Sequence, residues 1–268
     1  MMTTSKPQVV LLHGAWHSPV YFSKITALLQ DHLYVVHAQQ LSAVGVPPSW
    51  TPPENLVQDT AAARSLLDYA IGEGNDVIVI CHSWGGTIAG SALVGYGKEE
   101  RAKKGLKGGV VKVGYMCALI INEGISLYEL VGGEYPPWYD IDVRYCDSSS
   151  NDTDRLQGPY TKVNDPGVMY NGLPEDEQTY WFSQLQSHSL ATLHAPTLGA
   201  SWKTIPSSYL MCEQDRAIPV QVQETMVNAA KEEGASVDVT TLDTGHSPYL
   251  TKPKETVAWI RRVAGETL

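Results

Sequence analysis

The sequence predicts an α/β fold in which helices cover both faces of a mostly parallel sheet. Short apolar runs, each of strand length, alternate along the chain with longer segments of helical periodicity. A serine, an aspartate and a histidine, all common catalytic residues, follow three of these runs at positions 83, 215 and 246. Because ligands of open α/β sheets bind beyond the carboxyl ends of the strands, the pattern predicts a doubly wound sheet with its functional site at that edge.

The expected elements alternate as such a fold requires. Strands are expected near 8–12, 33–36, 76–80, 110–116, 208–212 and 237–242, and helices near 19–30, 54–72, 84–96, 220–233 and 254–262. The lysine-rich stretch 98–107 is expected to be a solvated loop at a helix end.

The alternation stops between residues 120 and 204. This segment holds 11 of the chain's 23 aromatic residues, which disfavours disorder. We therefore expect residues 1–119 and 205–268 to form the core and residues 120–204 to form an inserted cap. The rings predict an apolar substrate pocket, and the candidate substrate-binding residues are Trp16, Tyr128, Trp138, Tyr139 and Trp181. The alternative is that the rings build a small core within the cap itself.

Ser83 lies between the apolar run 76–80 and the glycine pair Gly85 and Gly86. A serine at an abrupt strand-to-helix turn is typical of a nucleophile elbow, because the turn lifts its hydroxyl into the cleft and small neighbours leave it room. Cys81 stands where the first glycine of the usual Gly-x-Ser-x-Gly pattern is expected. The alternative is a serine that caps an ordinary helix.

Two backbone N–H groups are candidates for an oxyanion hole. The loop after the first expected strand carries Gly14 and Ala15, and the residue after the nucleophile is Trp84. The Ala15 and Trp84 amides would stabilise the negative charge that develops on an attacked carbonyl.

A base and an acid follow later strands, in the order serine, acid, histidine. His246 would take the proton of the Ser83 hydroxyl, and Asp215 would hold the imidazole in the required tautomer. Glu213 is a competing acid two residues away, whereas Asp243 precedes His246 too closely to reach around its ring.

These segments resemble the α/β-hydrolase superfamily. The chain is most similar to its compact branch of plant methylesterases, hydroxynitrile lyases and their fungal relatives, over nearly its whole length. The resemblance is carried by residues 13–15, 82–86, 212–219 and 245–246. It implies that Ser83, Asp215 and His246 act as nucleophile, acid and base.

The hydroxynitrile lyases of this branch differ from the chain at two positions. They carry a threonine where this chain has Gly14, and a lysine follows their catalytic histidine where this chain has Ser247. That lysine stabilises departing cyanide by its charge, which a serine lacks. The resemblance therefore favours hydrolysis.

Composition agrees with a single enzyme domain. The chain has 268 residues, 43% of them hydrophobic, and a net charge of −10, which disfavours nucleic-acid binding. We expect no membrane span and no signal peptide, hence a cytoplasmic protein that acts on a small molecule, with a homodimer possible. Reduced cysteines are expected at positions 81, 117, 146 and 212. No cofactor is expected. His13 and His17 have the spacing of metal ligands, but no third ligand is near them in the sequence, so we expect no metal site.

The predicted reaction is hydrolysis of an ester-like bond in a small apolar substrate through an acyl-enzyme. One alternative is cleavage or rearrangement of a carbon–carbon bond, because the same oxyanion hole would stabilise an enolate. A second alternative is non-catalytic binding of a small ligand on this scaffold.

Overall fold

The computed structural model describes residues 6–47, 49–142 and 160–268. Within these residues six strands form one parallel sheet in the order β2-β1-β3-β4-β8-β9. The strands are β1 (Gln8–Leu12), β2 (Val36–Ala38), β3 (Asp76–His82), β4 (Gly109–Met116), β8 (Ser207–Cys212) and β9 (Val237–Leu242). The fold class predicted from the sequence is confirmed.

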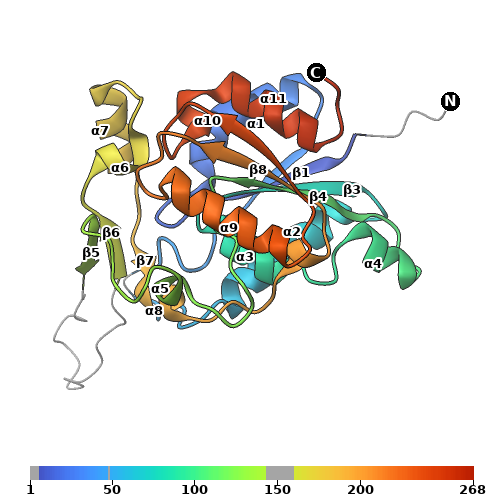
Figure 1. Cartoon of the computed structure of the whole chain (residues 1–268), viewed down its shortest axis with the longest axis horizontal. Helices are drawn as coiled ribbons and strands as arrows, with labels where there is room; N and C mark the ends of the chain where they lie inside the picture. The colour runs from blue at the N-terminus through green and yellow to red at the C-terminus, as the bar shows by residue number, and fades with distance from the viewer. Residues whose placement is uncertain (1–5, 48, 143–159) are drawn as a thin grey trace.

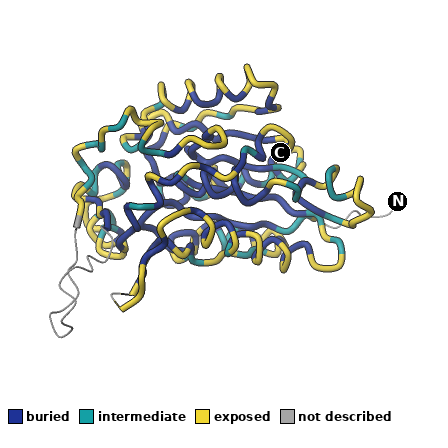
Figure 2. The backbone as a smooth tube through the Cα atoms, turned by 90° about the horizontal axis from the view of Figure 1, so that it is seen from below, coloured by how far each residue is buried: buried dark blue, intermediate teal, exposed yellow. Residues whose placement is uncertain are grey.

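The central strands are rich in β-branched residues and buried on both faces. Residues 77–82 of β3 and all of β8 are buried, as expected for strands of a parallel sheet that helices cover on both sides. Figure 2 shows buried backbone running through the middle of the molecule, with exposed segments around it.

Helices form a layer on each face of the sheet. In Figure 1, α1 (Ser23–Asp31), α10 (Pro248–Thr251) and α11 (Pro253–Val263) lie above the sheet, and α2 (Val57–Ile71), α3 (Gly85–Ala92) and α9 (Val220–Glu232) lie below it. The packing is close: a Cβ at Gly114 of β4 would come within 2.8 Å of the Trp259 ring of α11. Glycine at this position lets the helix approach the sheet.

The chain between β4 and β8 forms a second group of elements at one end of the sheet (Figure 1). Among the described residues it holds an antiparallel sheet of β5 (Tyr139–Asp142), β6 (Tyr160–Val163) and β7 (His188–Ser189). The helices of this segment are α5 (Leu127–Leu130), α6 (Pro166–Tyr170), α7 (Glu175–Ser183), α8 (Leu190–His194) and the 3₁₀ turn η2 (Ser201–Lys203). We call the described part of residues 120–204 the cap.

Three sequence-based boundaries were wrong. The helix expected near 84–96 ends at residue 92, the end of α3. β2 begins at Val36 rather than near residue 33, because Leu33 has a φ of 63° and the Tyr34 amide bonds to Leu29 O, so these residues complete the end of α1. The stretch 98–107 begins with a short helix, α4 (Lys98–Lys103), and is not all loop. Acidic residues in the first turn of α4 and basic residues in its last turn stabilise this helix, because they interact favourably with its dipole.

In the described part of the chain, no helix is both long and apolar enough to cross a membrane. Cys81, Cys117 and Cys212 are buried free thiols. Cys146, the fourth predicted thiol, lies outside the described residues.

Candidate active site

Ser83 follows β3 at a sharp turn into α3. Its φ of 52° is in the left-handed region, which is strained for a residue with a side chain. The turn is held on both sides, because the Ser83 amide donates to Met116 O at 3.4 Å and Leu119 N donates to Ser83 O at 3.1 Å. The strand-to-helix geometry expected of a nucleophile elbow is therefore present.

The two glycines after the elbow allow backbones to touch. A Cβ at Gly85 would lie 2.5 Å from Leu12 O, and a Cβ at Gly86 would lie 2.2 Å from Leu119 O. Any larger residue would push α3 away from β1 or from the segment after β4. Cys81, which replaces the usual first glycine, is fully buried in β3 and donates from Sγ to Gly114 O at 3.5 Å.

The structure brings Asp215 and His246 together at the ends of β8 and β9. Both are buried, and His246 Nδ1 donates to Asp215 Oδ2 at 2.8 Å. The other carboxylate oxygen accepts the N–H groups of Ala217 and Ile218, both at 2.8 Å. Glu213 and Asp243, the other acids considered, are exposed.

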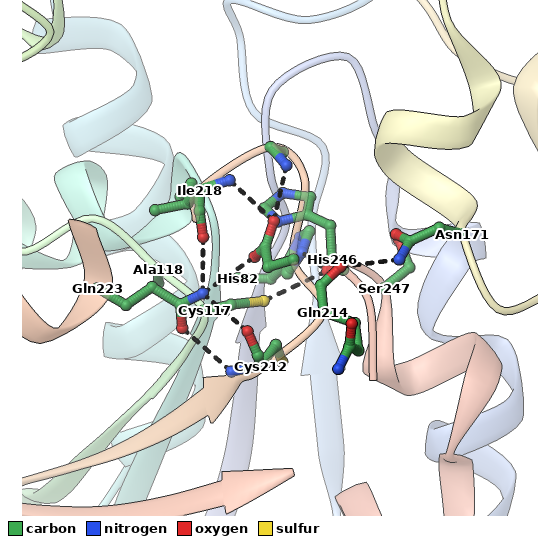
Figure 3. Close-up of polar contacts among 12 residues, drawn as sticks. His82, Cys117, Ala118, Asn171, Cys212, Gln214, Ile218, Gln223, His246 and Ser247 are labelled. Atoms are coloured by element: carbon green, nitrogen blue, oxygen red, sulfur yellow. Dashed lines mark hydrogen bonds and ion pairs between the residues drawn. The ribbon is translucent and has the colours of Figure 1, made fainter. Parts of the chain in front are cut away.

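Two side chains bond to the backbone carbonyl of His246 (Figure 3). His82 Nε2 donates to His246 O at 2.8 Å, and Cys117 Sγ donates to the same oxygen at 3.3 Å. Burial and the neighbouring histidines lower the pKa of His82 well below its ordinary value, so its ring is neutral with the proton on Nε2. A Cβ at Gly14 would lie 2.9 Å from His82 Nδ1, so this glycine leaves room for the ring.

Ser83 and His246 line one cavity of about 380 Å³ between the sheet edge and the cap. Its walls are mainly apolar and include Leu119, Leu127, Leu130, Val131, Ile218 and Val222. Among the described residues that line it there is no lysine, arginine, aspartate or glutamate. The Ser83 hydroxyl makes no hydrogen bond within the described residues; catalytic hydrogen bonds are often long until substrate binds.

The two amides expected to form the oxyanion hole belong to residues that line the same cavity. Ala15 and Trp84 flank Ser83 there, and in the described part of the chain neither backbone N–H donates a hydrogen bond. Two unengaged amides beside a nucleophile are suited to bind an oxyanion.

The candidate substrate-binding aromatics fall into two groups. Trp16, Trp138 and Tyr139 line the cavity and pack edge to face, with ring centroids 4.3 to 5.9 Å apart. Tyr128 and Trp181 do not lie among the cavity-lining residues that the structure describes. The structure therefore does not place these two rings at the cavity wall.

The rings of Tyr128 and Trp181 are used within the cap and at its base. Tyr128 packs against the rings of Tyr135 and His194, with centroids 5.0 and 4.4 Å away. Trp181 packs on Tyr21 of the core at 5.1 Å, and its carbonyl accepts the Tyr21 hydroxyl. Tyr128 therefore packs within the cap, as the alternative interpretation held, whereas Trp181 joins the cap to the core.

Sequence reasoning missed Gln223 of α9 (Figure 3), which is fully buried and whose Nε2 donates to Asp215 Oδ2 at 3.3 Å. Its Oε1 accepts the Cys212 amide at 3.1 Å, and its Nε2 donates to Ile218 O at 2.7 Å. Gln223 thus joins the two ends of the loop that carries the acid. A glutamine on the buried face of an amphipathic helix was the one signal that could have revealed it.

The spacing of His13 and His17 serves hydrogen bonding in this structure. His13 bonds to Gly14 O and accepts the Leu41 amide at 2.9 Å. His17 Nδ1 donates to Ala15 O at 2.6 Å, and its Nε2 accepts the Tyr170 hydroxyl at 3.1 Å. Burial lowers the pKa of His13 to about 4 and that of His17 to about 3, so both rings are neutral.

Comparison with known proteins identifies the family. A family model described as "Alpha/beta hydrolase family" matches residues 9–259. The chain belongs to the alpha/beta hydrolase family. It is therefore a hydrolase, and the resemblance predicted from residues 13–15, 82–86, 212–219 and 245–246 is confirmed.

Relatives and solved structures agree over nearly the whole chain. "Alpha/beta hydrolase nvfD" of Aspergillus novofumigatus is 30% identical and aligns over 98% of both chains. "Methylesterase 7" of Arabidopsis thaliana is 23% identical, again over 98% of both chains. Among solved structures, polyneuridine aldehyde esterase has a TM-score of 0.73 at 18% identity, covering 97% of this chain and 100% of its own.

Proposed function

We propose that the hydrolase cleaves ester bonds of small, uncharged, apolar substrates through an acyl-enzyme on Ser83. The observation that carries the proposal is the lining of one apolar cavity by Ser83, at a left-handed strand-to-helix turn, and by His246, which is paired with buried Asp215. The family's methylesterase and esterase members support ester hydrolysis in general.

Each residue has a separate task in this reaction. His246 Nε2 takes the proton of the Ser83 hydroxyl as Oγ attacks the ester carbonyl, and later gives it to the leaving alcohol. Asp215 accepts a hydrogen bond from the Nδ1–H group of His246 and stabilises the imidazolium that forms, without taking the proton itself. The amides of Ala15 and Trp84 bind the oxyanion, and water then releases the acid in a second round.

The cavity lining favours a neutral substrate. A charged group would lose its hydration without meeting an opposite charge, since none lies among the described lining residues. Hydroxynitrile lyase chemistry is not favoured, because Ser247 carries no charge that could stabilise departing cyanide. Ser247 is fully buried, and its Oγ lies 3.2 Å from the Tyr249 hydroxyl.

The test is kinetic and uses two p-nitrophenyl esters of equal chain length, one neutral and one ending in a carboxylate. We expect kcat/KM for the neutral ester to exceed that for the anionic ester at least about tenfold. Ser83→Ala should reduce kcat by about 10⁴-fold or more. The matched control is Ser236→Ala, because Ser236 is exposed and lies directly before β9.

Three results would contradict the proposal. Undiminished ester turnover by Ser83→Ala would show that another group reacts. Turnover of a β-diketone without any ester hydrolysis would favour carbon–carbon bond cleavage. Binding of apolar esters without turnover would favour a ligand-binding role.

A further inference from the structure

The end of cap helix α6 contacts three parts of the candidate active site through consecutive residues. Met169 lines the cavity. Tyr170 bonds to His17, in the loop that carries Ala15. Asn171 bonds to the loop that carries Asp215. One short segment of the cap therefore reaches the substrate space, the oxyanion loop and the acid loop.

The first contact is a hydrogen-bonded chain that ends at Ala15. The His17 ring is buried and neutral, and its Nδ1 donates to Ala15 O at 2.6 Å. The proton is thus on Nδ1, so Nε2 must accept the Tyr170 hydroxyl, 3.1 Å away. The chain Tyr170, His17, Ala15 fixes the orientation of a peptide group adjoining the proposed oxyanion amide.

The residue between them, Trp16, is also held by the cap. It has a φ of 61°, an unfavourable conformation for a bulky residue. Its Nε1 donates to Thr161 O at 3.0 Å, and Gln186 N donates to Trp16 O at 2.9 Å. Cap contacts therefore help to hold the strained backbone at Trp16.

The second contact lies on the other side of the cavity. Asn171 Nδ2 donates to Gln214 O at 2.8 Å, one residue before Asp215 (Figure 3). A Cβ at Gly245 would come within 2.2 Å of Asn171 Oδ1, so the asparagine lies directly against the residue before His246. Asn171 thus touches both loops of the acid–base pair.

We propose that Tyr170 and Asn171 are positioning residues, through which the cap sets the geometry of the oxyanion loop and of the acid–base loops. Neither touches the reacting atoms: Tyr170 acts through His17, and Asn171 acts through Gln214 and Gly245. This inference rests on the proposed ester hydrolysis. Met169, the residue before Tyr170, lines the cavity, so the segment that holds both loops also borders the proposed substrate space.

The oxyanion arm is tested with Tyr170→Phe, which removes one hydroxyl and keeps the ring. We expect kcat/KM for a neutral p-nitrophenyl ester to fall roughly tenfold, the worth of one buried hydrogen bond, with KM unchanged. Affinity for a trifluoromethyl ketone, which forms an oxyanion on Ser83, should fall by the same factor. Affinity for the corresponding methyl ketone should not change. The matched control is Tyr180→Phe, because the Tyr180 ring is exposed on the cap.

The acid–base arm is tested with Asn171→Ala. We expect the rate of Ser83 labelling by a fluorophosphonate to fall roughly tenfold, because labelling needs His246 as base. The matched control is Asn228→Ala, at an exposed position of α9. Melting temperatures of all variants are compared with that of the wild type.

Several outcomes would overturn the inference. One is that Tyr170→Phe and Asn171→Ala change rates no more than their controls do, and another is that they lower the melting temperature while kcat stays constant. A rate loss in Tyr170→Phe with unchanged trifluoromethyl ketone affinity would overturn the oxyanion arm. If Tyr170→Phe does not fold, His17→Asn replaces it, since the asparagine amide keeps a donor to Ala15 O but cannot reach Tyr170.

Failure of the proposed function looks different from failure of this inference. If the wild type neither hydrolyses esters nor reacts with fluorophosphonate, the proposed function itself is wrong. If the wild type does both and the two variants behave like their controls, only the positioning role is wrong.

Discussion

The core and the cap differ in what holds them together. The core strands pair in a continuous parallel ladder, and the strands that precede Ser83, Asp215 and His246 are β3, β8 and β9. The described cap consists of short elements joined by ring packing and a small antiparallel sheet. The three proposed catalytic residues therefore all come from the core, whereas the apolar walls of the cavity come from both regions: Leu119, Ile218 and Val222 belong to the core, and Leu127, Trp138 and Met169 belong to the cap.

The two regions meet through hydrogen bonds as well as ring packing. Besides the contacts of Trp16, Tyr170 and Asn171, the cap amide Ser189 N donates to Ala43 O at 2.9 Å. Substitutions in the core edge should therefore affect the chemical step. Those in the cap should affect substrate binding or the seating of the cap.

The largest effect is expected in the core, from Asp215→Asn. The asparagine amide would donate to His246 Nδ1 and leave the ring in the wrong tautomer, so kcat should fall by about 10⁴-fold. The matched control is Glu213→Gln, two residues away and exposed, which should stay within about twofold of the wild type. Steady-state kinetics on one neutral ester measure both. Equal losses in the two variants would refute the assignment of the acid.

A smaller effect is expected in the cap, from two tryptophans with different surroundings. Trp138→Ala removes part of the cavity wall and should raise KM roughly 10- to 100-fold, with a smaller change in kcat. Trp181→Ala should leave KM near the wild-type value and lower the free energy of unfolding by about 3 kcal/mol, because the ring packs on Tyr21. Kinetics and urea unfolding separate the two. The reverse pattern would show that Trp181, and not Trp138, lines the substrate cavity.

The last effect changes stability and depends on pH, and it concerns Asp59 of α2, at the contact between core and cap. Asp59 is fully buried, and its Oδ1 accepts the Ala43 amide at 2.9 Å, which anchors the residue that pairs with Ser189. Burial raises the Asp59 pKa to about 6, because ionisation is unfavourable there.

The sign of the pH effect follows from the raised pKa. The folded protein holds this proton more tightly than the unfolded chain, whose carboxyl has a pKa near 3.8, so stability falls as the pH rises from about 4 to about 6. Asp59→Asn should therefore gain stability over the wild type across this window, by up to about 3 kcal/mol above pH 6. Urea unfolding at several pH values measures it. Parallel stability curves for the two proteins would contradict the prediction.

The sequence was most informative where backbone geometry and chemistry coincide. Ser83, Asp215 and His246 each follow an apolar run, so a parallel sheet must bring them to one edge. The role of the glycines after Ser83 could be predicted as well, because a tight turn with close contact between backbones leaves no room for a side chain.

The cap was less predictable because its rings have no periodicity that indicates a direction. Trp138 and Trp181 look alike in sequence, and their roles are set by contacts with the core residues Trp16 and Tyr21. The same holds for Gln223 and Asn171, whose partners lie on loops that only the folded chain brings near.

The most direct test of the account is to find where the acyl group goes during turnover. The enzyme is mixed with a slowly hydrolysed neutral p-nitrophenyl ester, quenched in acid, and digested for peptide mass spectrometry. The account predicts an added acyl mass on the peptide that carries Ser83, and its loss in Ser83→Ala. Turnover with no acyl group on Ser83, or with the group on another residue, would contradict it.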